Sequence, residues 1–149
     1  MRYYSSHVTG EMPTLHVKNN RPDLDEPLSH AFNGVIRNRA TDDAETKALL
    51  EEMDEIGLDP ANAKPGRSIV VSMYCKTVDD AVKFTQLYNT GRVQYILESI
   101  LNRLILTIEP HNKEKLDSRV SLEEEDAITL EEFTGIEGNS FETFSTDFC

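Results

Sequence analysis

Residues 67–108 constrain the fold of this chain most, because they hold the densest apolar pattern in the sequence. Residues 68–75, SIVVSMYC, are rich in β-branched residues and almost continuously apolar, which predicts a strand that is covered on both faces. Thr77 and Asp80 follow at the spacing of a capping box, in which a Thr oxygen and an acidic side chain satisfy free amides at a helix start. This pattern predicts a helix over residues 78–88 that stops at Asn89-Thr90-Gly91.

A second helix is predicted from apolar residues that recur at steps of three and four, which makes one wide apolar face over roughly four turns. The last part, residues 104–108, also fits a strand, but we expect the helix to continue until Pro110 disfavours it. The wide face predicts burial against the preceding strand, with Leu101 at its centre and Glu98 on the solvent side. The apolar residues are Val93, Ile96, Leu97, Ile100, Leu101, Leu104, Ile105 and Ile108.

The sequence before this block is less strongly patterned. We expect residues 1–26 to be a flexible lead-in, within which residues 14–18 alternate as a short strand would. Two helices are predicted upstream of the block, the second of them ended by Gly57. A linker with two prolines and a glycine follows. The helices span residues 27–40 and 41–56, and the linker spans residues 60–66.

After the block, residues 116–122 predict a strand and residues 127–133 a short helix. Residues 135–149 form an acidic tail that we expect to be flexible. Its three aromatic residues cannot all reach a core, so they are candidates for a short partner-binding motif: Phe141, Phe144 and Phe148. We therefore expect one α+β interaction domain over residues 27–134, with its best-supported core at 67–127.

The charge of the chain limits its partners. The net charge is −12, and residues 113–149 alone carry three basic and eleven acidic residues. Such a chain is repelled by phosphate backbones and anionic membranes, so neither nucleic acid nor membrane is an expected partner. The first residues lack the apolar run of a signal peptide, and two cysteines cannot build a disulfide scaffold. We expect a cytoplasmic location.

Few residue patterns in the chain carry chemistry. The four histidines have no cysteine or carboxylate at metal-ligand spacing. The acidic run at residues 123–126 lacks the alternating ligands and glycine of an EF-hand loop. No dinucleotide-binding, P-loop or nucleophile-elbow pattern occurs. We predict no catalytic, cofactor-binding or metal-binding residues. The histidines are His7, His16, His30 and His111.

One pairing leaves an enzyme open as an alternative. Cys75 and the distant His111 could act as nucleophile and base, although a free cysteine on an apolar strand is usually a small core residue. The alternative is thus a small α/β enzyme or ligand-binding domain with Cys75 near a pocket. A third hypothesis is a scaffold that works as a homo-oligomer through its acidic surface.

The central residues resemble one known family. The strand SIVVSMYC, the helix TVDDAVKFTQLY, the break NTGR, the helix VQYILESILNRLI and the later segment VSLEEEDA are similar to the N-terminal domain of the TNF-receptor-associated death-domain adaptor (the TRADD N-domain) and its invertebrate relatives. The resemblance covers roughly the central 60 residues.

The resemblance implies a two-layer sandwich, a small twisted antiparallel sheet with helices packed on one side. It also implies binding of a protein partner, TRAF-like by analogy, in apoptosis or innate-immune signalling. No death domain follows in this sequence, so the expectation is a free-standing or truncated module, and no partner-contacting residue is carried over. The leading hypothesis is therefore a non-enzymatic protein-interaction adaptor.

Overall fold

The computed structural model describes residues 11–38 and 41–134. In chain order the elements are β1 (Glu11–Asn19), the 3₁₀ helix η2 (Pro22–Leu24), α1 (Asp25–Asn38), α2 (Ala44–Ile56), β2 (Pro60–Pro65), β3 (Ile69–Tyr74), α3 (Val78–Asn89), α4 (Arg92–Ile108), β4 (Ser118–Leu122) and α5 (Glu124–Thr134). The α+β class is confirmed.

The four strands form one antiparallel sheet in the order β2-β3-β1-β4. β1 is an interior strand, in which Leu15 lies opposite Val71 of β3 and Leu122 of β4. The expectation that residues 1–26 are a flexible lead-in is therefore wrong for residues 11–19. The alternation of Leu15 and Val17 did mark the strand, but the domain begins well before residue 27.

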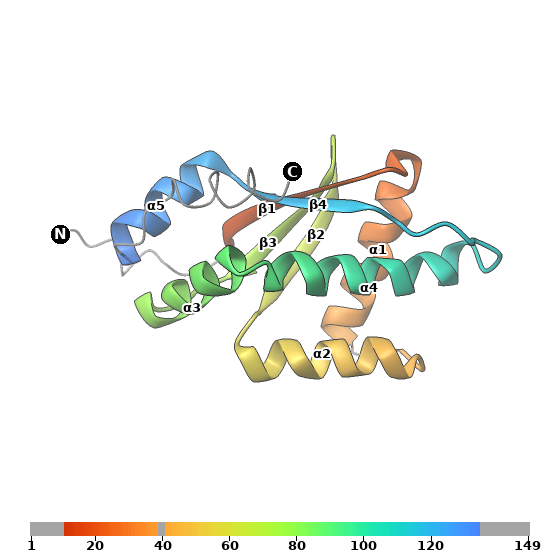
Figure 1. The fold of residues 1–149 in the computed structure, drawn as a ribbon, viewed down its shortest axis with the longest axis horizontal. Helices are drawn as coiled ribbons and strands as arrows, with labels where there is room; N and C mark the ends of the chain where they lie inside the picture. Colours follow the sequence, from red (N-terminus) through yellow and green to blue (C-terminus); the bar gives the residue numbers. More distant parts are fainter. Residues whose placement is uncertain (1–10, 39–40, 135–149) are drawn as a thin grey trace.

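In the described ranges, helices pack on one face of the sheet, whereas the opposite face carries half-buried and exposed side chains and meets the start of α5 at β1. In β3 the side chains of Ile69, Val71 and Met73 are buried, whereas Tyr74 is exposed and the residues between are half-buried. Figure 1 shows α4 and α2 below strands β1 and β4 in this view, with the β2–β3 turn at the top. The two-layer arrangement is confirmed. On the second face of β3, Val70 and Ser72 are half-buried, so within the described ranges the full cover predicted for both faces is found on one face and only partly on the other.

Helix α4 carries the largest share of the helical core, because seven of its residues are buried on one face. Leu101 is 2% exposed, as its position predicts, and residues 104–108 are helical rather than extended. Phe32 of α1 and Met53 of α2 join the same core. Glu98 differs from expectation: it is half-buried, and its Oε2 accepts a hydrogen bond from the Ser118 backbone N–H at 3.0 Å.

Local sequence signals fix the helix ends. The Thr77 hydroxyl accepts from the Asp80 N–H at 3.1 Å, as the capping-box spacing predicts. The Asp80 carboxylate, however, accepts from the N–H of Lys76, one residue before the cap. Gly57 ends α2 at φ 81°, and Gly91 sits at φ 83° between α3 and α4, where a side chain would strain the backbone.

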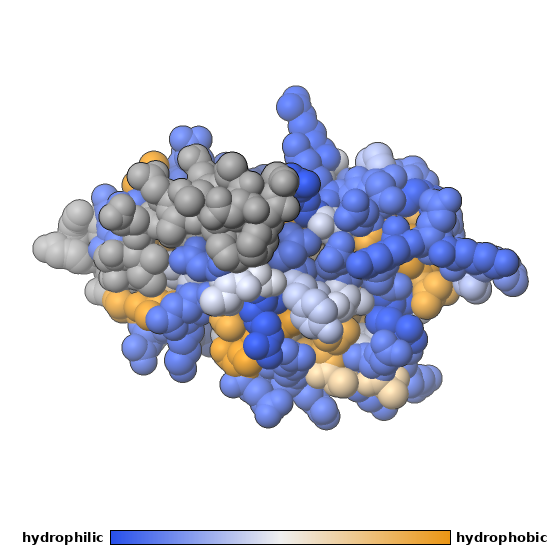
Figure 2. Space-filling view, viewed as in Figure 1, coloured by the Kyte–Doolittle hydropathy of each residue, from blue (hydrophilic) through white to orange (hydrophobic). Residues whose placement is uncertain are grey.

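Two other expectations need correction. Residues 60–65 are not a linker but the strand β2, and the acidic residues 124–126 belong to the first turn of α5 rather than to a solvated turn. The aromatic tail 135–149 lies outside the described residues. None of the described helices is long and apolar enough to cross a membrane. Figure 2 shows a mainly hydrophilic surface on one face of the molecule, with its hydrophobic residues in separate patches.

Candidate functional site

The two edges of the sheet are closed by side-chain amides. On β2, the Asn33 side chain of α1 donates to the Ala63 carbonyl at 2.9 Å and accepts from the Ala63 N–H at 2.7 Å. On β4, the Gln94 side chain of α4 donates to the Ser118 carbonyl at 2.7 Å and accepts from the Val120 N–H at 2.8 Å. Each amide takes the place that a neighbouring strand would fill.

The β4 edge has two further partners. Glu98 accepts from the Ser118 N–H, and the Tyr88 hydroxyl accepts from the Leu122 N–H at 3.2 Å. Burial raises the pKa of Tyr88, so this phenol stays neutral and remains an acceptor over the ordinary pH range. A partner that binds by adding a strand therefore meets edge groups that are already satisfied.

The face of the sheet opposite the helices offers a different kind of surface, which we call the open face. Its side chains alternate along the strands with the buried ones, as the register requires. Those in the middle are half-buried and those at the rim are exposed. The open face consists of Thr14, His16, Lys18, Lys64, Val70, Ser72, Arg119 and Ser121.

His16 occupies the centre of the open face. Its Nε2 pairs with the Glu123 carboxylate, and its Nδ1 lies 3.5 Å from the Ser68 hydroxyl. The order serine, histidine, acid is that of a nucleophile, base and orienting group. Ser68, however, is only 4% exposed, and 3.5 Å is the outer limit of a hydrogen bond. The cluster therefore acts as a link between strands β3 and β1 and the residue that precedes α5.

A second contact ties the start of α5 to β1. The Thr14 N–H donates to the Asp126 carboxylate at 2.6 Å, and the Glu123 N–H donates to the Thr14 carbonyl at 3.0 Å. Burial raises the pKa of Asp126, and the hydrogen bond from Thr14 opposes this rise because it stabilises the charged carboxylate. The predicted acidic run thus serves to dock α5 against the sheet.

The end of the open face near the β2–β3 turn is basic. Lys18 and Arg119 are direct cross-strand partners, Lys64 lies on β2, and Arg67 lies in the turn. All four side chains are exposed. We call this group the basic corner. Lys18 and Arg119 are far in the sequence from each other and from Lys64 and Arg67, so no local charge run predicts the group.

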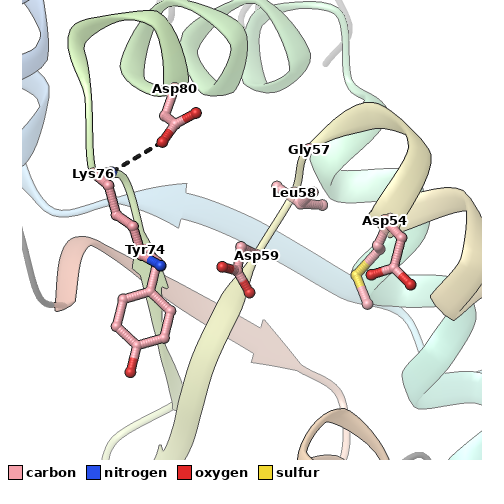
Figure 3. Close-up of a pocket in the computed structure, with 8 residues that line it drawn as sticks. Asp54, Gly57, Leu58, Asp59, Tyr74, Lys76 and Asp80 are labelled. Carbon is pink, nitrogen blue, oxygen red and sulfur yellow. Dashed lines mark hydrogen bonds between the residues drawn. The ribbon is translucent and has the colours of Figure 1, made fainter.

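A pocket of about 350 Å³ lies beyond the other end of β3. Figure 3 shows Lys76 beside the ring of Tyr74, and its ammonium is 5.8 Å from the ring centroid. Asp54, Asp59 and Asp80 line the pocket. The described residues nevertheless hold no group of three or more His, Cys, Asp or Glu fit to bind a metal ion. The lining residues are Met53, Asp54, Gly57, Leu58, Asp59, Tyr74, Lys76 and Asp80.

Cys75 does not line this pocket, although both its neighbours in sequence do. Its side chain is 2% exposed within the core, and burial raises the pKa of the thiol to about 12. The thiolate that nucleophilic attack requires is therefore scarce near neutral pH. His111, its notional base, is exposed in the loop after α4.

A second, open pocket of about 440 Å³ lies between α4 and the loop that follows it. Tyr95, 59% exposed, and Arg103 are among its lining residues. Asn102 fixes the loop, since its side chain donates to the Leu116 carbonyl at 3.0 Å and accepts from the Leu116 N–H at 2.7 Å.

The structure brings together few of the residues singled out from sequence. The predicted partner-binding residues Phe141, Phe144 and Phe148 lie outside the described residues, as does His7. His30 is exposed on α1. His16 lies at the centre of the open face, and the 107 residues that separate it from Glu123 hide the pair from any local pattern.

Comparison with known proteins adds no relative to this picture. No protein-family model matches the chain, and no match was found among curated proteins or solved structures.

Proposed function

We propose that this chain is a non-enzymatic protein-interaction domain, an adaptor module that binds a protein partner on the open face of its sheet. The observation that carries the proposal is the asymmetry of the sheet. Helices cover one face and side-chain amides occupy both edges, while the open face holds half-buried and exposed side chains. A partner surface that adds burial to these side chains gains contact area without displacing any existing hydrogen bond.

The resemblance to the death-domain adaptor family supports the same class of function and suggests a pathway. On that basis we propose a cytoplasmic role in death-receptor-like or innate-immune signalling, with a TRAF-like protein as one partner by analogy. The following experiment tests protein binding on the open face and is independent of the pathway.

The test is a steric block of the open face. Ser121 is exposed on β4 beside His16, and a tyrosine there fits a strand while filling the face. Gln86→Tyr, on the exposed side of α3, adds the same bulk elsewhere. Proximity labelling in the native cell compares the proteins enriched by the wild type, by Ser121→Tyr and by Gln86→Tyr.

We expect a saturable set of partners that Ser121→Tyr loses and Gln86→Tyr retains. Circular dichroism of both variants checks that the fold is unchanged. Enrichment of abundant chaperones alone, or equal loss with both variants, would reject the proposal.

A second candidate, a ligand-binding domain, is favoured by the pocket beside Tyr74 and Lys76. A volume of about 350 Å³ is within the usual range for small-molecule sites. A thermal-shift screen tests it: a ligand that raises the Tm of the wild type but not of Asp59→Asn would place binding in this pocket. If the screen finds no such ligand, the pocket is an ordinary depression of the surface and the second candidate is rejected.

A further inference from the structure

We propose that the partner segment bound on the open face is acidic and extended, and that the basic corner binds its carboxylates. The inference rests on the proposed function, because it concerns the same face, and it adds the chemical class of the partner. Its first support is position: Lys18, Lys64, Arg67 and Arg119 come from three strands and one turn, and the register places them at one end of the sheet.

The second support is an unfavourable pair of like charges. Lys18 and Arg119 are opposite each other in the β1–β4 ladder, so their side chains leave the same face of adjacent strands. Like charges in this position destabilise a sheet. In a chain with 27 acidic and 15 basic residues two cations stand side by side at this point, and a bound carboxylate would relieve their repulsion.

The third support is the lack of internal partners. Arg21, Arg92 and Arg103 each form an ion pair with a carboxylate of this chain. No member of the basic corner forms an ion pair with another residue of the described ranges 11–38 and 41–134. An incoming carboxylate would therefore break no ion pair between these donors and another residue of the part of the chain that the structure describes.

The acidic groups of the chain determine which end of the open face attracts the carboxylates of the partner segment. At the far end of the open face, Glu123 is bound to His16 and Asp126 to the Thr14 backbone. Asp117, just before β4, is the carboxylate nearest in sequence to Arg119. A bound segment is thus attracted at the turn end and repelled at the α5 end, so its carboxylates gather over the basic corner.

The size of the basic corner favours a peptide over a nucleic acid or a membrane. Four strands span about 14 Å, since neighbouring strands are about 4.8 Å apart. A duplex or an anionic bilayer extends well beyond this width and would meet the acidic remainder of a chain whose net charge is −12. An extended protein segment can confine its contacts to the corner.

The experiment is an NMR titration of the ¹⁵N-labelled full chain. The probe is a peptide of alternating Glu and Ser, about ten residues long and roughly 33 Å when extended. The test variant combines Lys18→Glu with Arg119→Glu. The matched control combines Lys47→Glu with Lys83→Glu, exposed residues of α2 and α3, and so reaches the same net charge.

We expect saturable shifts at the amides of β1, β4 and the β2–β3 turn, weakened about tenfold in the test variant and unchanged in the control. Raising the salt concentration should weaken binding as well. The single variant Lys18→Glu checks the fold independently: it creates an opposite-charge pair with Arg119 and should raise the Tm while it weakens binding.

Other results would overturn the inference. Equal weakening of peptide binding in the test and control variants would show a non-specific charge effect. If the peptide causes no shifts at all, the open face does not bind an acidic segment. Shifts caused by phosphatidylserine vesicles or oligo-uridylate, but not by the peptide, would assign the corner to another class of ligand. Peptide binding seen only after Glu137→Gln, Glu142→Gln and Asp147→Asn would instead support the inference, with these acidic residues of the chain as competitors of the peptide.

The two proposals fail separately. If Ser121→Tyr loses cellular partners while Lys18→Glu with Arg119→Glu retains them, the open face binds protein through contacts other than the basic corner, and only the further inference falls. If both variants retain every partner, the proposed function and the further inference are both rejected.

Discussion

Asn33 of α1 forms two hydrogen bonds with the backbone of Ala63, one to the carbonyl and one from the N–H. Ala63 is 3% exposed, so water cannot replace this amide. The pair makes α1 the outer neighbour of the β2 edge at Ala63, and the proposed partner would therefore bind on the open face rather than beside this residue. A single side chain thus joins α1 to the backbone of the outer strand β2.

Asn33→Ala should lower the free energy of unfolding by about 1–3 kcal/mol, because it leaves a buried N–H and carbonyl without partners. Freed strand edges also promote pairing between copies. Urea unfolding measures the loss, and light scattering measures association. Asn38→Ala, exposed on the last turn of α1, is the matched control and should stay within about 0.5 kcal/mol. Equal effects at both positions would show that the amide bridge is unimportant.

Leu101→Ala should cost about 2–5 kcal/mol, because it opens a cavity on the buried face of α4. Glu98→Ala is not a neutral control, since it removes the bond to the Ser118 N–H. Tyr95→Ala, 59% exposed on the same helix, serves instead. Urea unfolding that finds similar losses for Leu101→Ala and Tyr95→Ala would contradict the assignment of the buried face.

Asp43→Asn should reduce stability at neutral pH by about 1 kcal/mol, because Arg103 loses a two-pronged partner with bonds at 3.1 and 2.6 Å. The Arg103 guanidinium holds the pKa of Asp43 well below its usual range, so the wild type has this stability above about pH 4 and loses it as pH falls further. Urea unfolding measures the difference in free energy of unfolding between the wild type and Asp43→Asn, and this difference should be smaller at pH 2 than at pH 7. If the difference is the same at both pH values, the ion pair does not contribute to stability.

Cys75 should react slowly with a thiol reagent in the native protein. Its burial and raised pKa leave little accessible thiolate, whereas unfolding exposes the group. The measurement uses Cys149→Ser, which leaves Cys75 as the one remaining thiol of a chain with two cysteines. We expect labelling to accelerate with urea along the unfolding curve. Rapid labelling at neutral pH without urea would revive the enzyme hypothesis.

The sequence predicted the parts of this fold that local patterns control. The wide apolar face of α4, the Thr77 cap and the Gly57 stop each depend on residues within a few positions of one another. These features needed no knowledge of the tertiary structure.

The elements that depend on distant partners were missed. β2 reads PANAKP, in which Pro60 and Pro65 oppose strand structure, and it exists because β3 pairs on one side and Asn33 on the other. The open face has the same origin: His16 meets Glu123, and Lys18 meets Arg119, across sequence separations of about a hundred residues. No periodicity within one strand encodes such pairs.

Deletion of residues 135–149 should change the Tm little, since the buried cluster of residues 11–134 is continuous from β1 to α5. The aromatic motif predicted there still requires a test. If Phe141, Phe144 and Phe148 anchor a partner, the deletion should reduce partner enrichment, because aromatic anchors commonly carry much of an interface's energy. Replacing the three phenylalanines with serine in the full chain separates the rings from the acidic charge. A large fall in Tm would instead show that the rings belong to the core, and unchanged binding with unchanged Tm would remove them from the partner interface.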